Sequence, residues 1–169
     1  AGNNPISFSD PYGLCPPYDD DPCNFDTGDP NLDDPERRNI VETTFKGAPA
    51  TKDSRNPGLK DEIWAWAFTT ADGSLESVTS VGGPTVVQPT NQPVGAIFGA
   101  HGHVNEGKLV CCGQNGNRAF ASSGGPSRPD KAIAHEATVP TYIVGKDKIW
   151  RLDPGTGKKT TFDRWTSPK

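Results

Sequence analysis

Glycine and proline recur along most of the chain and limit the length of any regular element. The sequence has 19 glycines and 17 prolines among 169 residues, and its hydrophobic fraction is only 32%. Proline disrupts helix interiors and central strands, and glycine weakens both. These proportions predict short helices and short strands joined by many loops around one small core. The length fits one domain of ordinary size plus an appendage.

Charge and hydropathy exclude two broad classes of function. The formal net charge is −4 and no run of Lys and Arg occurs, which argues against a protein that works mainly by gripping nucleic-acid phosphates. No apolar stretch approaches the roughly 20 residues that span a bilayer, and no charged-then-apolar signal pattern occurs at the N-terminus. We therefore expect a soluble protein without a membrane span.

Local patterns predict a mixed α+β fold, with a mixed sheet flanked by short helices. The Pro-initiated segment 35–46 predicts a helix, and a second short helix is expected from Lys131. Alternating large side chains around Ala71-Asp72-Gly73-Ser74 predict a β-hairpin over 62–80, in which Trp64, Trp66 and Phe68 share one strand face. The remaining predicted strands are 94–103, which ends in polar residues, and two short strands within 141–152.

The N-terminal region is expected to lie outside this domain. Residues 15–34 are rich in Pro and Asp, with too little apolar surface to offset chain entropy, and predict a linker. The domain is then expected from residue 35 to 169. Four cysteines, two of them adjacent at 111 and 112, are too few and too oddly placed for a disulfide scaffold. Inert thiols are the simplest expectation.

Two polar motifs carry candidate chemistry. His101 and His103 end a predicted strand, where an i, i+2 pair directs both imidazoles to the same side and can clamp one metal ion. Ser127 and Asp130 come at the entrance of the second predicted helix. That Ser-x-x-Asp pattern is also the ordinary signature of a helix cap, so its function is open from the motif alone.

The first fourteen residues resemble a motif of Rhs proteins. Pro5, Asp10, Pro11, Gly13 and Leu14 match each fixed position of the P-x4-D-P-x-G-L sequence that closes the Rhs core. The resemblance implies that residues 1–14 are the end of an Rhs core shell and that the following chain is a variable toxin. It also implies autoproteolytic cleavage between Leu14 and Cys15, delivery into a target cell by a secretion apparatus, and a cognate immunity protein.

The remaining chain resembles JAB/MPN hydrolases, which have a cytidine-deaminase-like fold. A Glu before a strand, His-x-His at a strand end and Ser-x2-Asp at a helix entrance follow in the same order. The resemblance implies that His101, His103 and Asp130 bind Zn²⁺, that Glu62 is the general base and that Ser127 stabilises an oxyanion. It further implies a peptidase or isopeptidase acting on a protein or peptide substrate.

Two departures from the JAB pattern leave alternatives open. Val104 stands where Pro usually follows the second His, and residues 104–126 separate it from Ser127. This insertion could recognise substrate, act as a lid or reflect a change of chemistry. Glu76, Glu106 and Asp61 are also available as the base. A metal-free binding or inhibitory module, and a metal-dependent nuclease or amidase, are the alternative functions.

Overall fold

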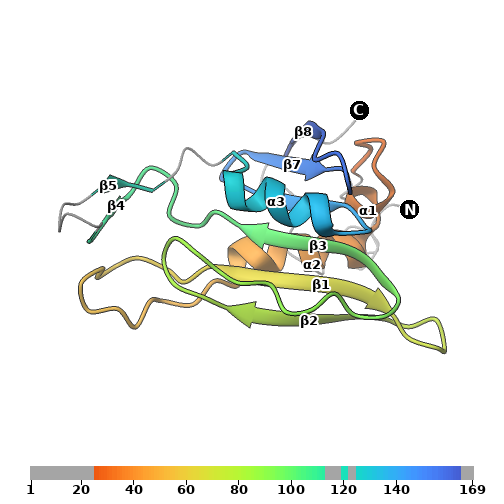
Figure 1. The fold of residues 1–169 in the computed structure, drawn as a ribbon, viewed down its shortest axis with the longest axis horizontal. Coiled ribbons are helices and arrows are strands. Elements are labelled where there is room, and N and C mark those ends of the chain that lie inside the picture. Colours follow the sequence, from red (N-terminus) through yellow and green to blue (C-terminus); the bar gives the residue numbers. More distant parts are fainter. Residues whose placement is uncertain (1–24, 113–118, 122–124, 165–169) are drawn as a thin grey trace, which may run out of the picture.

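A six-stranded mixed sheet organises the part of the chain that the computed structural model describes, residues 25–112, 119–121 and 125–164 (Figure 1). The predicted α+β class is therefore confirmed. The helices are α1 (Pro30–Asp33), α2 (Pro35–Lys46) and α3 (Arg128–Glu136). The strands are β1 (Ile63–Thr69), β2 (Leu75–Val81), β3 (Ala96–Gly102), β4 (Leu109–Val110), β5 (Ala119–Phe120), β6 (Thr141–Val144), β7 (Lys148–Leu152) and β8 (Lys159–Asp163).

The sheet has the strand order β2-β1-β3-β6-β7-β8. Its neighbours pair antiparallel except β3 and β6, which are parallel. Parallel strands need a crossover connection, and here that connection contains α3. The predicted hairpin and the predicted strands are confirmed. The outer strand β8 was not predicted, because Phe162 is the one large apolar residue in it.

Helices cover both faces of the sheet (Figure 1). On one face, called the α2 face, Leu32 and Val41 pack with side chains from β1, β3, β6 and β7, including Phe98 and Tyr142. On the other, the α3 face, Ile133 packs against Trp64 and Trp66 of β1. Successive side chains along a strand point to opposite faces of the sheet, so residues two apart in β1 or β3 lie on the same face.

The folded domain begins before residue 35, which corrects part of the predicted linker. Of segment 15–34, residues 25–34 are described, and they contain α1. Leu32 has 0% of its surface exposed and belongs to the main core. Asp29 caps α1 and accepts a hydrogen bond from the Tyr142 hydroxyl at 2.8 Å. The low apolar fraction of the segment hid these anchors, which also include the buried Phe25 and Asn31.

The predicted irregular segment between β3 and α3 contains two short strands. Strands β4 and β5 pair antiparallel with each other and lie away from the six-stranded sheet (Figure 1). Cys111 and Cys112, expected as free thiols, are joined in a disulfide. Among the described residues, no helix is both long and apolar enough to cross a membrane.

Candidate metal centre

Glu62, His101 and His103 meet because β1 and β3 pair in a fixed register. Trp64 pairs with His101 in the antiparallel ladder. Glu62 lies two residues before Trp64 and His103 two residues after His101, so all three side chains reach the α3 face. Each has no more than 6% of its surface exposed. The sequence order that suggested these residues therefore corresponds to spatial neighbours.

Gly102 permits this arrangement from the opposite face. A Cβ atom at Gly102 would lie 2.3 Å from the carbonyl oxygen of Thr44 in α2. Only a residue without a side chain lets α2 pack so closely on β3. In the His-Gly-His segment the glycine thus packs against α2, and the two histidine side chains lie on the α3 face.

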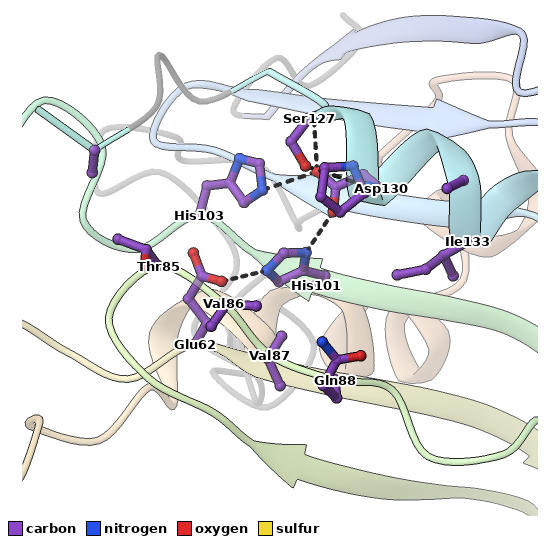
Figure 2. A pocket seen from close by; sticks show the side chains of 13 residues that line it. Glu62, Thr85, Val86, Val87, Gln88, His101, His103, Ser127, Asp130 and Ile133 are labelled. Carbon is purple, nitrogen blue, oxygen red and sulfur yellow. Dashed lines mark hydrogen bonds and ion pairs between the residues drawn. The ribbon is translucent and has the colours of Figure 1, made fainter. Parts of the chain in front are cut away.

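Asp130 enters the same cluster from α3. Its Oδ1 lies 3.1 Å from His101 Nδ1, and its Oδ2 lies 3.2 Å from His103 Nε2. The other nitrogen of His101, Nε2, lies 2.9 Å from Glu62 Oε2. Figure 2 shows His101 between the two carboxylates and Asp130 next to both imidazoles.

A capping box fixes the position of Asp130. Ser127 is the N-cap of α3, and its hydroxyl accepts a hydrogen bond from the Asp130 N–H at 3.3 Å. In return, Asp130 Oδ2 accepts from the Ser127 N–H at 2.8 Å. The helix begins at Arg128, earlier than the predicted start at Lys131, because Pro129 fits the first turn. The cap and the candidate site therefore use the same two residues.

The cluster attracts positive charge. Burial of His101 disfavours its charged form, but hydrogen bonds to Asp130 and Glu62 outweigh this and raise its pKa to about 9. Burial also opposes ionisation of Asp130, yet the hydrogen bonds from His101 and His103 hold its pKa well below the usual range. The Asp130 carboxylate, which contacts both His101 and His103, therefore supplies buried negative charge that a bound cation would offset.

The donor atoms fit a metal ion. One ligand atom each from Glu62, His101 and His103 can be chosen so that all lie within 4.8 Å of one another. Imidazole nitrogens and carboxylate oxygens are ligands that zinc and several other transition metals accept. These three buried residues therefore lie close enough to hold a metal ion.

All the residues predicted for the catalytic and metal site line one cavity of about 520 Å³. They are Glu62, His101, His103, Ser127 and Asp130. Among the other candidate bases, Glu76 lies on the exposed part of β2 and Glu106 accepts from the Lys146 N–H. Glu62 is thus the glutamate that reaches the histidines. The predicted cleavage position, Leu14 and Cys15, lies outside the described residues.

Sequence reasoning missed the cavity wall that faces α3. Segment 85–88 lines the cavity opposite Pro129, Ala132 and Ile133 of that helix. It lies within the Gly- and Pro-rich stretch 82–93, so no local signal marked it as part of a site.

Asn105 was also missed, although it holds the surrounding segments together. It is 2% exposed, and its side-chain N–H groups donate to the carbonyl oxygens of Lys60 and Pro84, each at 2.7 Å. Its side-chain oxygen accepts from the Lys60 N–H at 3.0 Å. Asn105 thereby joins the loop after His103 to the segments that lead into Glu62 and into the 85–88 wall.

No protein-family model, curated protein or solved structure matches this chain. The resemblances to Rhs toxins and to JAB/MPN hydrolases therefore remain predictions from the sequence.

Proposed function

We propose that this chain is the C-terminal toxin region of an Rhs protein and that its folded domain is a zinc-dependent hydrolase of peptide or isopeptide bonds. The observation that carries the hydrolase proposal is the convergence of Glu62, His101, His103 and Asp130 in one cavity. The toxin assignment is supported by the motif in residues 1–14 and by the Pro- and Asp-rich composition of residues 15–24 that follow it. Delivery to a target cell and neutralisation by an immunity protein follow from that assignment.

We assign Asp130 as the third metal ligand and Glu62 as the base. Asp130 contacts both imidazoles, at 3.1 Å and 3.2 Å, and such separations approximate the edge of a tetrahedral site with bonds of about 2.0–2.2 Å. Glu62 also lies within reach of the site, because one ligand atom each from Glu62, His101 and His103 lie within 4.8 Å of one another. We assign Glu62 as the base because the resemblance to JAB/MPN hydrolases gives the ligand role to the aspartate and the role of the base to the glutamate.

Each residue of the site has a separate role in the proposed hydrolysis. A bound zinc ion supplies Lewis-acid activation of water and of a carbonyl group. Glu62 accepts the proton of the attacking water and returns it to the leaving nitrogen. The Ser127 hydroxyl, whose oxygen accepts a hydrogen bond from the Asp130 N–H, donates a hydrogen bond to the oxygen of the attacked carbonyl. The 2.9 Å contact to Glu62 orients the His101 ring.

A second candidate is a metal-free binding or inhibitory module. The observation that favours it is the complete hydrogen bonding of His101, which contacts a carboxylate at each ring nitrogen. A protonated His101 satisfied in this way is a stable buried network without any metal. Such a toxin would act by occupying a target rather than by cleaving it.

Metal content and toxicity, measured together, separate the two candidates. The full chain without a His tag is purified beside the double variant His101→Ala/His103→Ala, and zinc per chain is determined by elemental analysis. Both forms are also expressed in a bacterial cytosol, and their soluble levels are matched. About one zinc per chain, lost with toxicity in the variant, is the expected result. If the wild-type chain contains no metal and is nevertheless toxic, the hydrolase proposal is refuted.

A further inference from the structure

We propose that the groove between segment 85–88 and α3 is a specificity pocket for an uncharged aliphatic side chain next to the attacked carbonyl. This inference rests on the proposed hydrolase function and adds the class of substrate. It concerns Val86, Val87, Ala132 and Ile133, which none of the sequence motifs included. All four line the same cavity as the candidate metal centre.

The groove has a polar end and an aliphatic end. Figure 2 shows the carboxylates and imidazoles clustered around His101, with Val87 and Ile133 beyond that ring and the exposed Gln88 side chain beside them. Val87 is buried and Ile133 is half-buried, and both pack against the Trp64–Trp66 cluster. Their positions are therefore fixed by the core, and the aliphatic surface they present does not depend on a mobile side chain.

Val86 and Ala132 extend this aliphatic surface toward solvent. Val86 is 54% exposed, and Ala132 is exposed on α3. Exposed aliphatic groups beside a buried polar cluster are the ordinary composition of a ligand site, where a few polar groups orient the ligand and apolar walls bind it. A substrate side chain bound between Val86 and Ala132 would shield its own apolar surface and that of the groove walls from water.

Charge distinguishes the substrate class. Among the described residues that line the cavity none is Lys or Arg, whereas Glu62 and Asp130 supply two carboxylates. A phosphodiester would find no cationic side chain on the groove wall to receive its negative charge. A neutral acyl group carries no such charge. The groove therefore favours a peptide or related amide over a nucleic acid.

Three matched hydroxamates test the pocket by binding alone. The probes are the hydroxamates of N-acetyl-leucine, N-acetyl-glycine and N-acetyl-aspartate, titrated into the zinc-loaded full chain by calorimetry. Leu and Asp side chains are similar in size and differ in charge. The leucine probe should bind roughly tenfold more tightly than the glycine probe, as expected if about half of its side chain leaves water. The aspartate probe should bind more weakly than the glycine probe.

Two valine variants localise the effect. Val86→Asp places a charge on the groove wall, and Val94→Asp places the same charge at a residue that is 98% exposed and lies outside the cavity lining. Val86→Asp should abolish the advantage of the leucine probe and leave the affinity for the glycine probe within about threefold, whereas Val94→Asp should change neither. The aliphatic Ala132→Val should retain the advantage.

The outcomes distinguish this inference from the proposed function. Equal binding of the leucine and glycine probes to the zinc-loaded chain would overturn the pocket and leave the metal centre intact. The same holds if Val86→Asp preserves the leucine advantage. A chain that takes up no zinc would overturn the proposed function, and the pocket would fall with it.

Discussion

Exchanging each carboxylate of the centre for its amide decides which one binds the metal. Glu62→Gln and Asp130→Asn keep the size of each side chain and remove its charge. Because Asp130 lies 3.1 Å from His101 and 3.2 Å from His103 and is the carboxylate that we assign as a ligand, we expect Asp130→Asn to weaken zinc binding more. The amide introduced by Asp130→Asn would keep a carbonyl oxygen for the Ser127 N–H, so the helix cap is preserved.

The size of the difference follows from ligand number. Structural zinc sites with four ligands bind with about 10–16 kcal/mol, so each ligand contributes about 3 kcal/mol. Loss of a ligand at Asp130 should therefore reduce zinc affinity by about 100-fold. Glu62 hydrogen-bonds the ligand His101, and loss of such a partner reduces metal affinity by about 10-fold to 100-fold. We expect the lower value for Glu62→Gln. Glu62→Gln should thus retain zinc at micromolar concentrations and lose hydrolysis.

Competition with a chromophoric chelator measures both affinities, and thermal melting in EDTA shows whether each variant is folded. Glu136→Gln is the matched control, because it makes the same exchange of carboxylate for amide at an exposed residue of α3 that does not line the cavity. If Glu62→Gln loses more zinc affinity than Asp130→Asn, Glu62 is the ligand and Asp130 only orients the histidines. The assignment of the base would then be wrong.

Three further predictions concern stability. In EDTA, the free energy of unfolding should fall by about 3 kcal/mol as the pH rises from about 6.5 to 9. The reason is that the pKa of His101 is about 9 in the folded chain and lower in the unfolded chain. Urea titrations at several pH values check this, and His101→Gln should remove the pH dependence. Leu32→Ala should cost about 3 kcal/mol, whereas Leu109→Ala, at a residue 49% exposed, should cost under about 1 kcal/mol; equal effects would exclude residues 25–34 from the core. Asn105→Ala should cost about 2–3 kcal/mol and weaken zinc binding, and a variant with unchanged melting and affinity would contradict its role in joining the surrounding segments.

Local signals in the sequence were sufficient for the elements that carry the site. Pro35 and Asp34 mark the start of α2, and the alternation of Trp64 and Trp66 marks β1. The i, i+2 spacing of His101 and His103 needs only a strand to place both rings on one side. These features depend on neighbours along the chain, and so they were predictable without the fold.

Features that depend on distant segments were not predictable in this way. Segment 85–88 and Asn105 gain their roles from α3 and from the loops before Glu62, which no spacing rule connects to them. The start of the domain was misplaced for the same reason. Asp29 in a Pro- and Asp-rich segment caps α1 locally, but it is tied to the sheet by Tyr142 and Arg151, which contact it from β6 and β7.

Asp130 shows why a motif can have a structural and a functional explanation at once. The Ser-x-x-Asp pattern predicts a cap, and the cap is present. The same carboxylate also contacts His101 and His103. The cap holds it in the first turn of α3, and Ile133 of that helix packs on the sheet. A ligand fixed in this way loses little conformational entropy when a metal binds. Zinc binding and the folding of the first turn of α3 should therefore stabilise each other, because both depend on the orientation of one side chain.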